Sequence, residues 1–372
     1  RALAESPPLP TRLSGFTIGS RNTSERLAVQ RLLGLGLSDT LDPTLLRSRV
    51  RHLASSEAFQ AVWLAPRGSG DSVSFDVNIR RAARRVAGLG LAYDNELGGR
   101  MWAGAVDRRL FDLALEGSTV LLLGEFRKEL YFGIRRNYQL ARQLMTPTLT
   151  GRLASESVRR FDADGDELST APTREAIGFL GVERAFEPGW QIAVGSTGHT
   201  WREPGREPST IGVVARVVKA SRSRGRVLGA ELLWTGRYHR AALDGEASVR
   251  AGPVRLRPRI QIGWGERLPL QATFPLGGED GFPGLHLGER RGDRELLLDL
   301  LITYALKGPF VGRLELATGR TASGGQLFGS NGWRAGARAG VGAETPLGPV
   351  RLEYGIADGG RGAVFVRLGK WF

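Results

Sequence analysis

Side chains that could perform chemistry are few in this sequence, and they lie far apart. The four histidines, His52, His199, His239 and His286, lack the spacing of a metal site. The chain has no cysteine, which excludes disulfides, thiolate metal centres and a cysteine nucleophile. The Gly-x-Ser-x-Gly elbow of a hydrolase does not occur either. We therefore predict that the chain is not an enzyme and that it holds no cofactor or metal.

The stretch Asp162–Asp166 has the alternating acids of a calcium loop. An EF-hand loop, however, needs glycine at its sixth position and a bidentate glutamate at its twelfth, where this sequence has Glu167 and Thr173. A short run of Asp and Gly is typical of a tight hairpin turn, and we predict such a turn here.

Arginine is the second feature with chemical meaning. The chain of 372 residues carries 52 Lys and Arg against 38 Asp and Glu, a net charge of +14. Seven arginines share one face of alternating segments: Arg255, Arg257, Arg259, Arg334, Arg338, Arg351 and Arg367. A period of two sends these side chains to one side of a strand rather than along a groove. No RNA- or DNA-binding module is recognisable, so we expect no nucleic-acid partner.

The elements that must position these arginines are strands. After residue 83 the helical pattern nearly vanishes, and sixteen alternating segments separated by turn residues follow. They are 85–95, 98–110, 115–126, 128–138, 146–161, 174–187, 189–202, 209–221, 226–238, 240–252, 254–266, 293–307, 309–322, 332–346, 348–358 and 361–372. Strands of about 9–11 residues joined by short turns are what a membrane β-barrel requires.

The two faces of these segments predict which side faces outward. One face carries Val, Leu, Ile and aromatic residues, whereas the other is rich in Arg and Gly. A soluble all-β protein, the alternative, would need a very large core to bury sixteen apolar faces. A barrel with apolar residues toward lipid and arginine toward a wet lumen satisfies both faces. We predict a mainly β fold, a 16-stranded antiparallel transmembrane β-barrel spanning residues 83–372.

The first 82 residues follow a different pattern. Residues 1–10 are predicted to form a linker. Residues 11–82 predict strand, helix, helix, strand and strand, with the helices near 24–34 and 42–53 and with Asp42 and Pro43 starting the second. This order is that of a small α+β module.

The C-terminal residues 361–372 form an alternating strand ending in Phe372, which resembles the insertion signal of bacterial outer-membrane barrels. Residues 345–354 resemble the penultimate strand of the BamA superfamily of insertases and translocators. That resemblance implies a sixteen-stranded barrel preceded by POTRA modules, one of which the α+β module resembles. It also implies a lumen-inserted sixth loop at about 268–293, between the eleventh and twelfth strands, with the loop residues Gly281, Phe282, Pro283, Gly284 and Arg291.

Shorter stretches resemble the branch of this superfamily that is fused to patatin-like phospholipases. These are 274–278, 288–293 and the hairpin 160–168.

The sequence departs from the superfamily pattern at two positions. The sixth loop has no arginine before its Gly281-Phe282 tip, and Glu315 on the thirteenth strand is one position off in the alternation. We predict that both members of a lumenal ion pair are lost together, because either one alone would be a costly unpaired charge.

The leading functional hypothesis is a barrel in the bacterial outer membrane that assembles or translocates proteins. Its POTRA module in the periplasm would receive an unfolded or tethered client by strand addition. A seam between the first and last strands would open, and Gly88, Gly90 and Gly369 would weaken packing there. The remaining expected partners are the lipid bilayer and lipopolysaccharide.

Two alternatives stay open at this point. The barrel could anchor an upstream patatin-like hydrolase domain of the same polypeptide, or it could be a simple anion-favouring pore. The lumenal arginines fit such a pore, generic lumenal polarity, or a seat for acids of the sixth loop. Those loop acids are Glu279, Asp280, Glu289 and Asp293.

Overall fold

The computed structural model of the chain divides into two compact units, which are described separately. The first contains Arg1–Val86 with residues 107–115 and 136–144, and the second contains the remaining residues. The structure describes residues 12–19, 26, 29–30, 33, 40–54, 59–68, 71–81, 83–108, 110, 115–136, 145–162, 164–186, 189–202, 207–221, 226–278, 281–325, 332–346 and 348–369.

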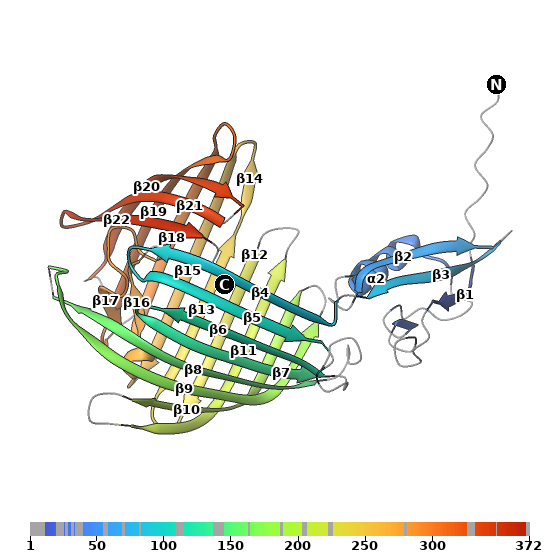
Figure 1. Ribbon diagram of the computed structural model, residues 1–372, viewed down its shortest axis with the longest axis horizontal. Coiled ribbons are helices and arrows are strands. Elements are labelled where there is room, and N and C mark those ends of the chain that lie inside the picture. Colours follow the sequence, from blue (N-terminus) through green and yellow to red (C-terminus); the bar gives the residue numbers. More distant parts are fainter. Residues whose placement is uncertain are drawn as a thin grey trace. The chain divides into compact units, whose positions relative to one another are not determined.

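The first unit holds a three-stranded sheet and a helix (Figure 1). Strand β3 (Ser72–Arg81) lies in the centre, parallel to β1 (Arg12–Ile18) and antiparallel to β2 (Phe59–Arg67). Helix α2 (Pro43–Ala54) starts where the sequence predicts, because Asp42 Oδ1 accepts the Thr44 N–H at 2.8 Å. A small core of Val29, Leu33, Leu53 and Val77 lies in this unit. Most of the first predicted helix lies outside the described residues.

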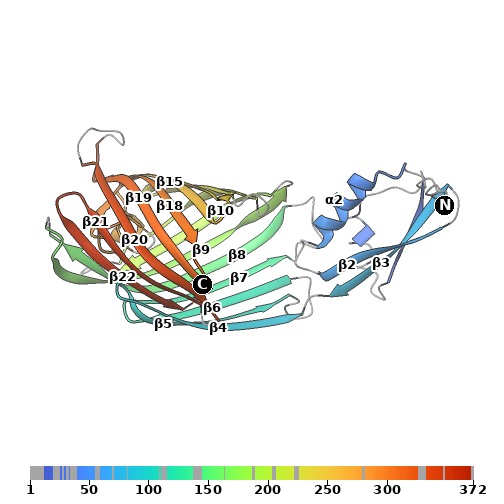
Figure 2. The ribbon, with the colours of Figure 1, turned by 90° about the horizontal axis from the view of Figure 1, so that it is seen from above.

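The second unit is a closed antiparallel barrel (Figures 1 and 2). Its strands are β4 (Arg85–Asp94), β5 (Gly98–Asp107), β6 (Leu115–Gly124), β7 (Arg127–Arg136), β8 (Thr146–Phe161), β9 (Glu167–Phe186), β10 (Trp190–Arg202), β11 (Ser209–Ser221), β12 (Arg226–Thr235), β13 (His239–Ala247), β14 (Val249–Ala251), β15 (Val254–Glu266), β18 (Arg294–Ala305), β19 (Phe310–Ala322), β20 (Arg334–Thr345), β21 (Gly348–Ala357) and β22 (Arg361–Gly369). Because β13 and β14 both pair with β15 as one interrupted strand, the described barrel has sixteen strands.

The prediction of a sixteen-stranded antiparallel barrel is therefore confirmed. The largest change in bounds is in β9, which begins at Glu167 instead of residue 174. As a result β8 and β9 form one long hairpin whose ladder runs from Thr146↔Glu183 to Phe161↔Glu167. The turn between them contains the acidic stretch 162–166, where Asp162 Oδ1 accepts the backbone N–H groups of Asp164 and Asp166.

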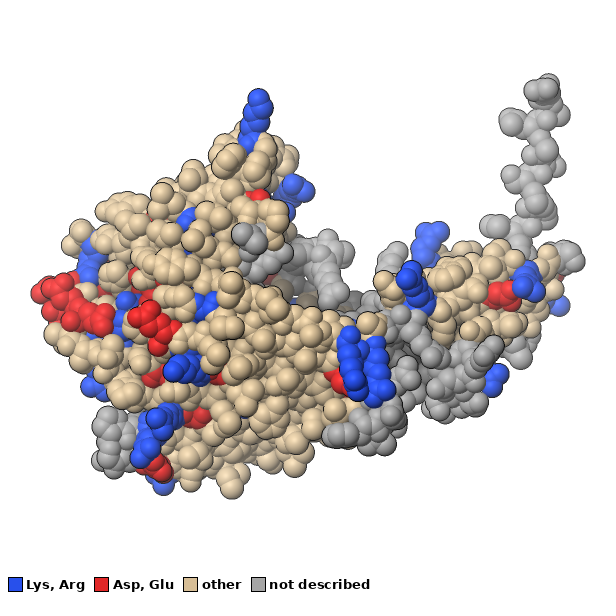
Figure 3. Space-filling view, viewed as in Figure 1, with Lys and Arg blue, Asp and Glu red and all other residues tan. Residues whose placement is uncertain are grey.

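The barrel is apolar outside and charged inside, as the alternation predicts. Leu89 and Ile211 are 80% and 78% exposed on its outer surface, whereas Arg338 and Glu353 are 2% and 3% exposed in its interior. Figure 3 shows a broad band of the outer face that is largely free of charged side chains. This is the reverse of a soluble sandwich, in which the Leu and Val rows would meet in a sealed core.

The segment between β15 and β18, the eleventh and twelfth barrel strands, is a folded loop of residues 267–293. It contains the 3-10 turn η4 (Leu270–Ala272) and a small hairpin of β16 (Phe274–Leu276) and β17 (Arg290–Gly292). We call residues 267–293 the lumenal loop. Within the described part of the chain, no helix is long and apolar enough to cross a membrane, and no group of three or more metal-ligating side chains occurs.

Candidate functional site: the lumenal loop and the barrel seam

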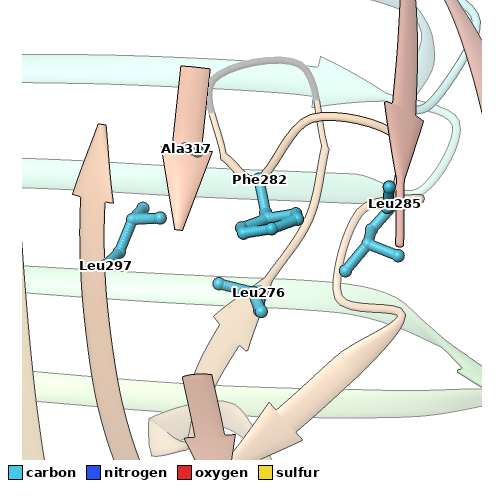
Figure 4. Packing of buried hydrophobic residues seen from close by; sticks show 6 residues of the cluster. Leu276, Phe282, Leu285, Leu297 and Ala317 are labelled. Atoms are coloured by element: carbon cyan, nitrogen blue, oxygen red, sulfur yellow. The ribbon is translucent and has the colours of Figure 1, made fainter. Parts of the chain in front are cut away.

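The lumenal loop is fixed to the inner wall of the barrel by a small apolar cluster. Phe282 and Leu276 of the loop are 0% and 1% exposed. With Leu285 they pack against wall residues of β18, β19 and β21, which are Leu297, Ala317 and Ala357. Figure 4 shows Phe282 pointing into the space between these side chains. Burying a phenylalanine side chain contributes about 1.5–3 kcal/mol, so the loop has a defined seat.

Glycines on both partners allow the loop tip to approach the wall closely. Gly284 has φ +78°, and its amide nitrogen lies 2.6 Å from where a Cβ on Gly355 of β21 would stand. On β20, a Cβ at Gly336 would stand 2.8 Å from the Phe282 ring. Of the predicted loop residues, Phe282, Pro283 and Gly284 thus lie against β20 and β21, whereas Gly281 lies against Gly277 of the loop itself. Glycine permits such close backbone contacts because it has no side chain.

Arg338 on β20 makes the principal ionic contacts beneath the loop. Its Nη2 lies 2.6 Å from Glu315 of β19, and its Nε lies 3.8 Å from Glu353 of β21. Its Nη1 donates to the carbonyl oxygen of Gly278 in the loop at 3.3 Å. The guanidinium carbon also lies 4.9 Å from the centre of the Phe365 ring. Arg338 therefore joins three barrel strands and the loop backbone.

This network corrects half of the prediction that both members of a lumenal ion pair are lost, because the acidic member is present. Glu315 lies on the lumenal face and is 6% exposed. Its alternation with the exposed Leu314 and Leu316 sets this face, and the β19–β20 register, which the sequence alone does not reveal, places it opposite Arg338. Since the loop tip has no arginine, the guanidinium comes from β20 instead.

The other predicted arginines have their own surroundings in the barrel wall. Arg257 makes two hydrogen bonds to Glu246, and Arg334 lies 3.5 Å from Asp358. Arg255 is exposed, and Arg259 lies opposite Asp299 in the β15–β18 register. Arg351 and Arg367 face each other between β21 and β22.

Two of the four predicted loop acids form ion pairs in the described part of the chain. Glu279 and Asp280 lie outside the described residues. Glu289 pairs with Arg361 at 3.2 Å, and Asp293 lies 3.5 Å from Arg294. Neither arginine belongs to the predicted set. Arg291 lies in β17 opposite Pro275, with a buried Nε that has no hydrogen-bond partner among the described residues.

The end of the loop that follows its apolar seat is bound by Glu96 in the β4–β5 turn. Glu96 accepts the Leu287 N–H at 2.9 Å and lies 2.7 Å from His286 Nδ1. Burial opposes ionisation of Glu96, but the bonds from His286 and Leu287 and the charge of Arg159 lower its carboxyl pKa to about 2. The bond to Glu96 raises the pKa of His286 above its usual value. The pair is therefore ionic at mildly acidic pH.

The barrel closes where β22 meets β4 (Figure 2), and we call this junction the seam. The described seam ladder consists of Arg367↔Asp94, Leu368↔Tyr93 and Gly369↔Ala92. Gly369 has φ +92°, and a Cβ there would collide with the Leu91 carbonyl. Phe372 lies outside the described residues. The seam is thus a short ladder that ends, in the described chain, at a left-handed residue.

Comparison with solved structures shows the same architecture. The chain is similar to BamA from Haemophilus ducreyi lacking POTRA domains 1–3, with a TM-score of 0.67 and 10% identity, over 96% of this chain and 84% of that one. It has the fold of BamA. CdiB from Acinetobacter baumannii matches with a TM-score of 0.63 and 12% identity, over 97% of this chain and 74% of its own. CdiB from Escherichia coli matches at 0.55 and 11%, over 99% and 91%. No family model and no curated protein matches the sequence.

In this BamA-like barrel, the seam glycines Gly88 and Gly90 have a steric role that the sequence does not indicate. Both lie on the lumenal side of β4, and the Trp102 ring of β5 covers them. A Cβ on Gly90 would overlap the indole nitrogen, and one on Gly88 would stand 3.3 Å from the ring. The glycines therefore create a flat surface for an aromatic side chain next to the seam.

Sequence reasoning also missed Asn95 and Glu96. The Asn95 side chain donates to the Val364 carbonyl at 2.6 Å and accepts the Val366 N–H at 3.0 Å, so it bonds the backbone of β22. The only signal in the sequence is the polar run Asp94-Asn95-Glu96 in a turn, which is also typical of an ordinary hairpin.

Proposed function

We propose that this chain is an outer-membrane barrel that inserts or translocates proteins by opening the seam between β4 and β22. The observation that carries this proposal is the short described seam ladder beside the longer β21–β22 ladder, in a barrel of BamA fold. Every second residue pair of an antiparallel ladder exchanges two backbone hydrogen bonds. The described seam has three pairs where the adjoining β21–β22 ladder has eight, so we propose that the barrel opens at the seam.

The outer surface supports a bilayer location. The exposed rows next to the seam are apolar, including Leu89, Leu91 and Tyr93 on β4 and Leu368 on β22. Removing such surface from water is favourable by about 25 cal/mol per Å², and a closed barrel satisfies its backbone groups within lipid. Lipid and lipopolysaccharide are accordingly the surroundings that we propose for these side chains, in the outer membrane of a bacterium.

The first unit is proposed to be a POTRA module that receives a client. Its strand order β1-β3-β2 leaves β2 as an edge, and Trp63 on that strand is 50% exposed. An extended client segment added to this edge would gain backbone hydrogen bonds in any sequence. The proposed client is therefore an unfolded or tethered polypeptide, and the proposed location of this unit is the periplasm.

A seam cross-link tests the opening step. We substitute Tyr93→Cys with Leu368→Cys, a directly opposed pair in a chain without native cysteine. Opposed residues of antiparallel strands have Cα atoms about 4.5–5.5 Å apart, which falls within the range of about 4.4–6.8 Å for disulfides. The control is Leu149→Cys with Leu180→Cys, an opposed pair in the long β8–β9 ladder.

The readout is protease protection of two clients presented to proteoliposomes: an unfolded outer-membrane barrel protein and a secreted β-rich polypeptide. We expect the unmodified protein to protect at least one client. The oxidised seam pair should abolish that protection and reduction should restore it, while the control pair has no effect in either state. Failure of the unmodified protein with both clients, or full activity with an oxidised seam, would overturn the proposal. The second result would favour the alternatives, a patatin-linked anchor or an anion-favouring pore.

A further inference from the structure

The tip of the β8–β9 hairpin meets the barrel near both sides of the seam. This hairpin is formed by the fifth and sixth strands of the barrel, so its base lies far along the sheet from β4 and β22. At its tip, however, Arg159 Nη2 lies 2.5 Å from Glu96 in the β4–β5 turn. The Phe161 ring also stacks on His286 of the lumenal loop, with 5.9 Å between ring centres and 4° between ring planes.

Arg361 provides the corresponding contact on β22. It is the first residue of β22, and it pairs with loop residue Glu289 at 3.2 Å. Its guanidinium lies directly over Gly165 in the β8–β9 turn, where any Cβ would overlap it. Glu289 in turn accepts the His286 N–H at 2.9 Å. Continuous contacts therefore run from β4 through the hairpin and the loop to β22.

We propose that the β8–β9 tip and the lumenal loop form a clasp that holds the two sides of the seam together at the end marked by Glu96 and Arg361. The proposal rests on the proposed opening of the seam and adds its regulation. When the seam opens, the Glu96 turn and Arg361 must move apart. Since both are tied to the same hairpin and loop, opening requires that the clasp release first.

The ion pairs of the clasp are largely buried. The side chains of Glu96 and Glu289 are 3% and 0% exposed, and those of Arg159 and Arg361 are 13% and 20% exposed. A buried ion pair is strongly destabilised when one partner is removed, because the remaining charge stays desolvated. A client or lipid that displaced one of these side chains would therefore weaken the whole clasp.

Two variants, located in different elements, each disrupt contacts of the clasp. Glu96→Gln removes the carboxylate that binds Arg159 and His286. Gly165→Ala forces Arg361 away from the hairpin, and its control is Gly252→Ala in the β14–β15 turn. Gly165 and Gly252 have positive φ values of +81° and +59°, but no atom lies within 4 Å of a Cβ at Gly252. Both glycine variants thus carry backbone strain, and only one disturbs Arg361.

The measurement is amide hydrogen exchange of the full chain in lipid nanodiscs, for peptides covering residues 281–289 and 361–366. We expect both segments to exchange at least about tenfold faster in Glu96→Gln and Gly165→Ala, because local opening becomes easier. Gly252→Ala should match the unmodified protein. If 361–366 keeps its exchange rate in both variants, even where the loop loosens, the clasp does not span the seam and the proposal fails. The assay contains no client, so its outcome is independent of the client-protection test.

Discussion

The β8–β9 ladder and the β4–β22 seam use the same antiparallel pairing but are held together in different ways. All sixteen residues of β8 pair along the β8–β9 ladder, whereas the described seam has three residue pairs. Around the described seam, side chains and the lumenal loop add further contacts, through Asn95, Glu96 and Arg361. Backbone ladders open with difficulty in lipid, because unpaired amides cost several kcal/mol each. Side-chain contacts can be exchanged for others, which suits a junction that opens.

Removing the anchor of the loop should have the largest effect. Arg338→Ala leaves the buried carboxylate of Glu315 without its arginine, whereas Glu353 keeps its ion pair with Arg313. Because a buried charge without a partner is costly, we expect a loss of about 3–5 kcal/mol in the free energy of unfolding. Urea titration followed by heat-modifiable gel mobility measures it. The control is Arg257→Ala, whose side chain is 39% exposed beside Glu246 and should cost about 0–1 kcal/mol. Equal losses in the two variants would contradict a special role for Arg338.

Filling the glycine surface under Trp102 should have the next largest effect. Gly90→Ala places a methyl group where the indole lies, and overpacking of this kind costs about 1–3 kcal/mol. Gly99→Ala on the neighbouring strand β5 meets no atom within 4 Å and should be nearly neutral. Unfolding midpoints in urea give the comparison. An unaffected Gly90→Ala would mean that Trp102 moves freely and does not define the wall beside the seam.

Loss of the Asn95 amide should weaken the seam by a smaller amount. Asn95→Ala removes two hydrogen bonds to the β22 backbone, each contributing about 0.5–1.5 kcal/mol net. We expect the amide of Val366 to exchange faster. The matched change in a long ladder is Thr303→Ala, which removes a 3.4 Å side-chain bond to the Arg255 carbonyl and should leave the neighbouring amides protected. Protection of Val366 in Asn95→Ala would remove the distinction between seam and ladder.

A change of pH should alter the contact between Glu96 and His286, and we expect this effect to be smaller than those of the three substitutions above. The raised pKa of His286 means that its contribution is complete below about 6.5, the unfolded value, and is lost as pH rises through the folded pKa. Glu96 contributes above its ordinary pKa of 4.5, and that contribution is lost as pH falls through about 2. Protease cleavage of the loop should therefore be slowest between these limits and faster at pH 8. His286→Gln should flatten the rise above pH 6.5.

Strand positions could be predicted because their signal is local. The alternation in 350–356 assigns the faces of β21 correctly, since a period of two requires no knowledge of partners. The pairing of Glu315 with Arg338 could not be predicted in this way. Those residues are brought opposite each other by the strand register. The sequences of β19 and β20 are compatible with several registers, so the sequence does not identify the partner.

The sequence by itself determined a sixteen-stranded barrel with arginine on its inner face, because apolar and polar residues alternate along each segment. Tertiary structure alone decided which carboxylates those arginines meet, and that a turn between the first two strands would bind both β22 and the lumenal loop. Glu96 and His286 are 190 residues apart. Closing the sheet into a barrel brings them together, and no local pattern records that closure.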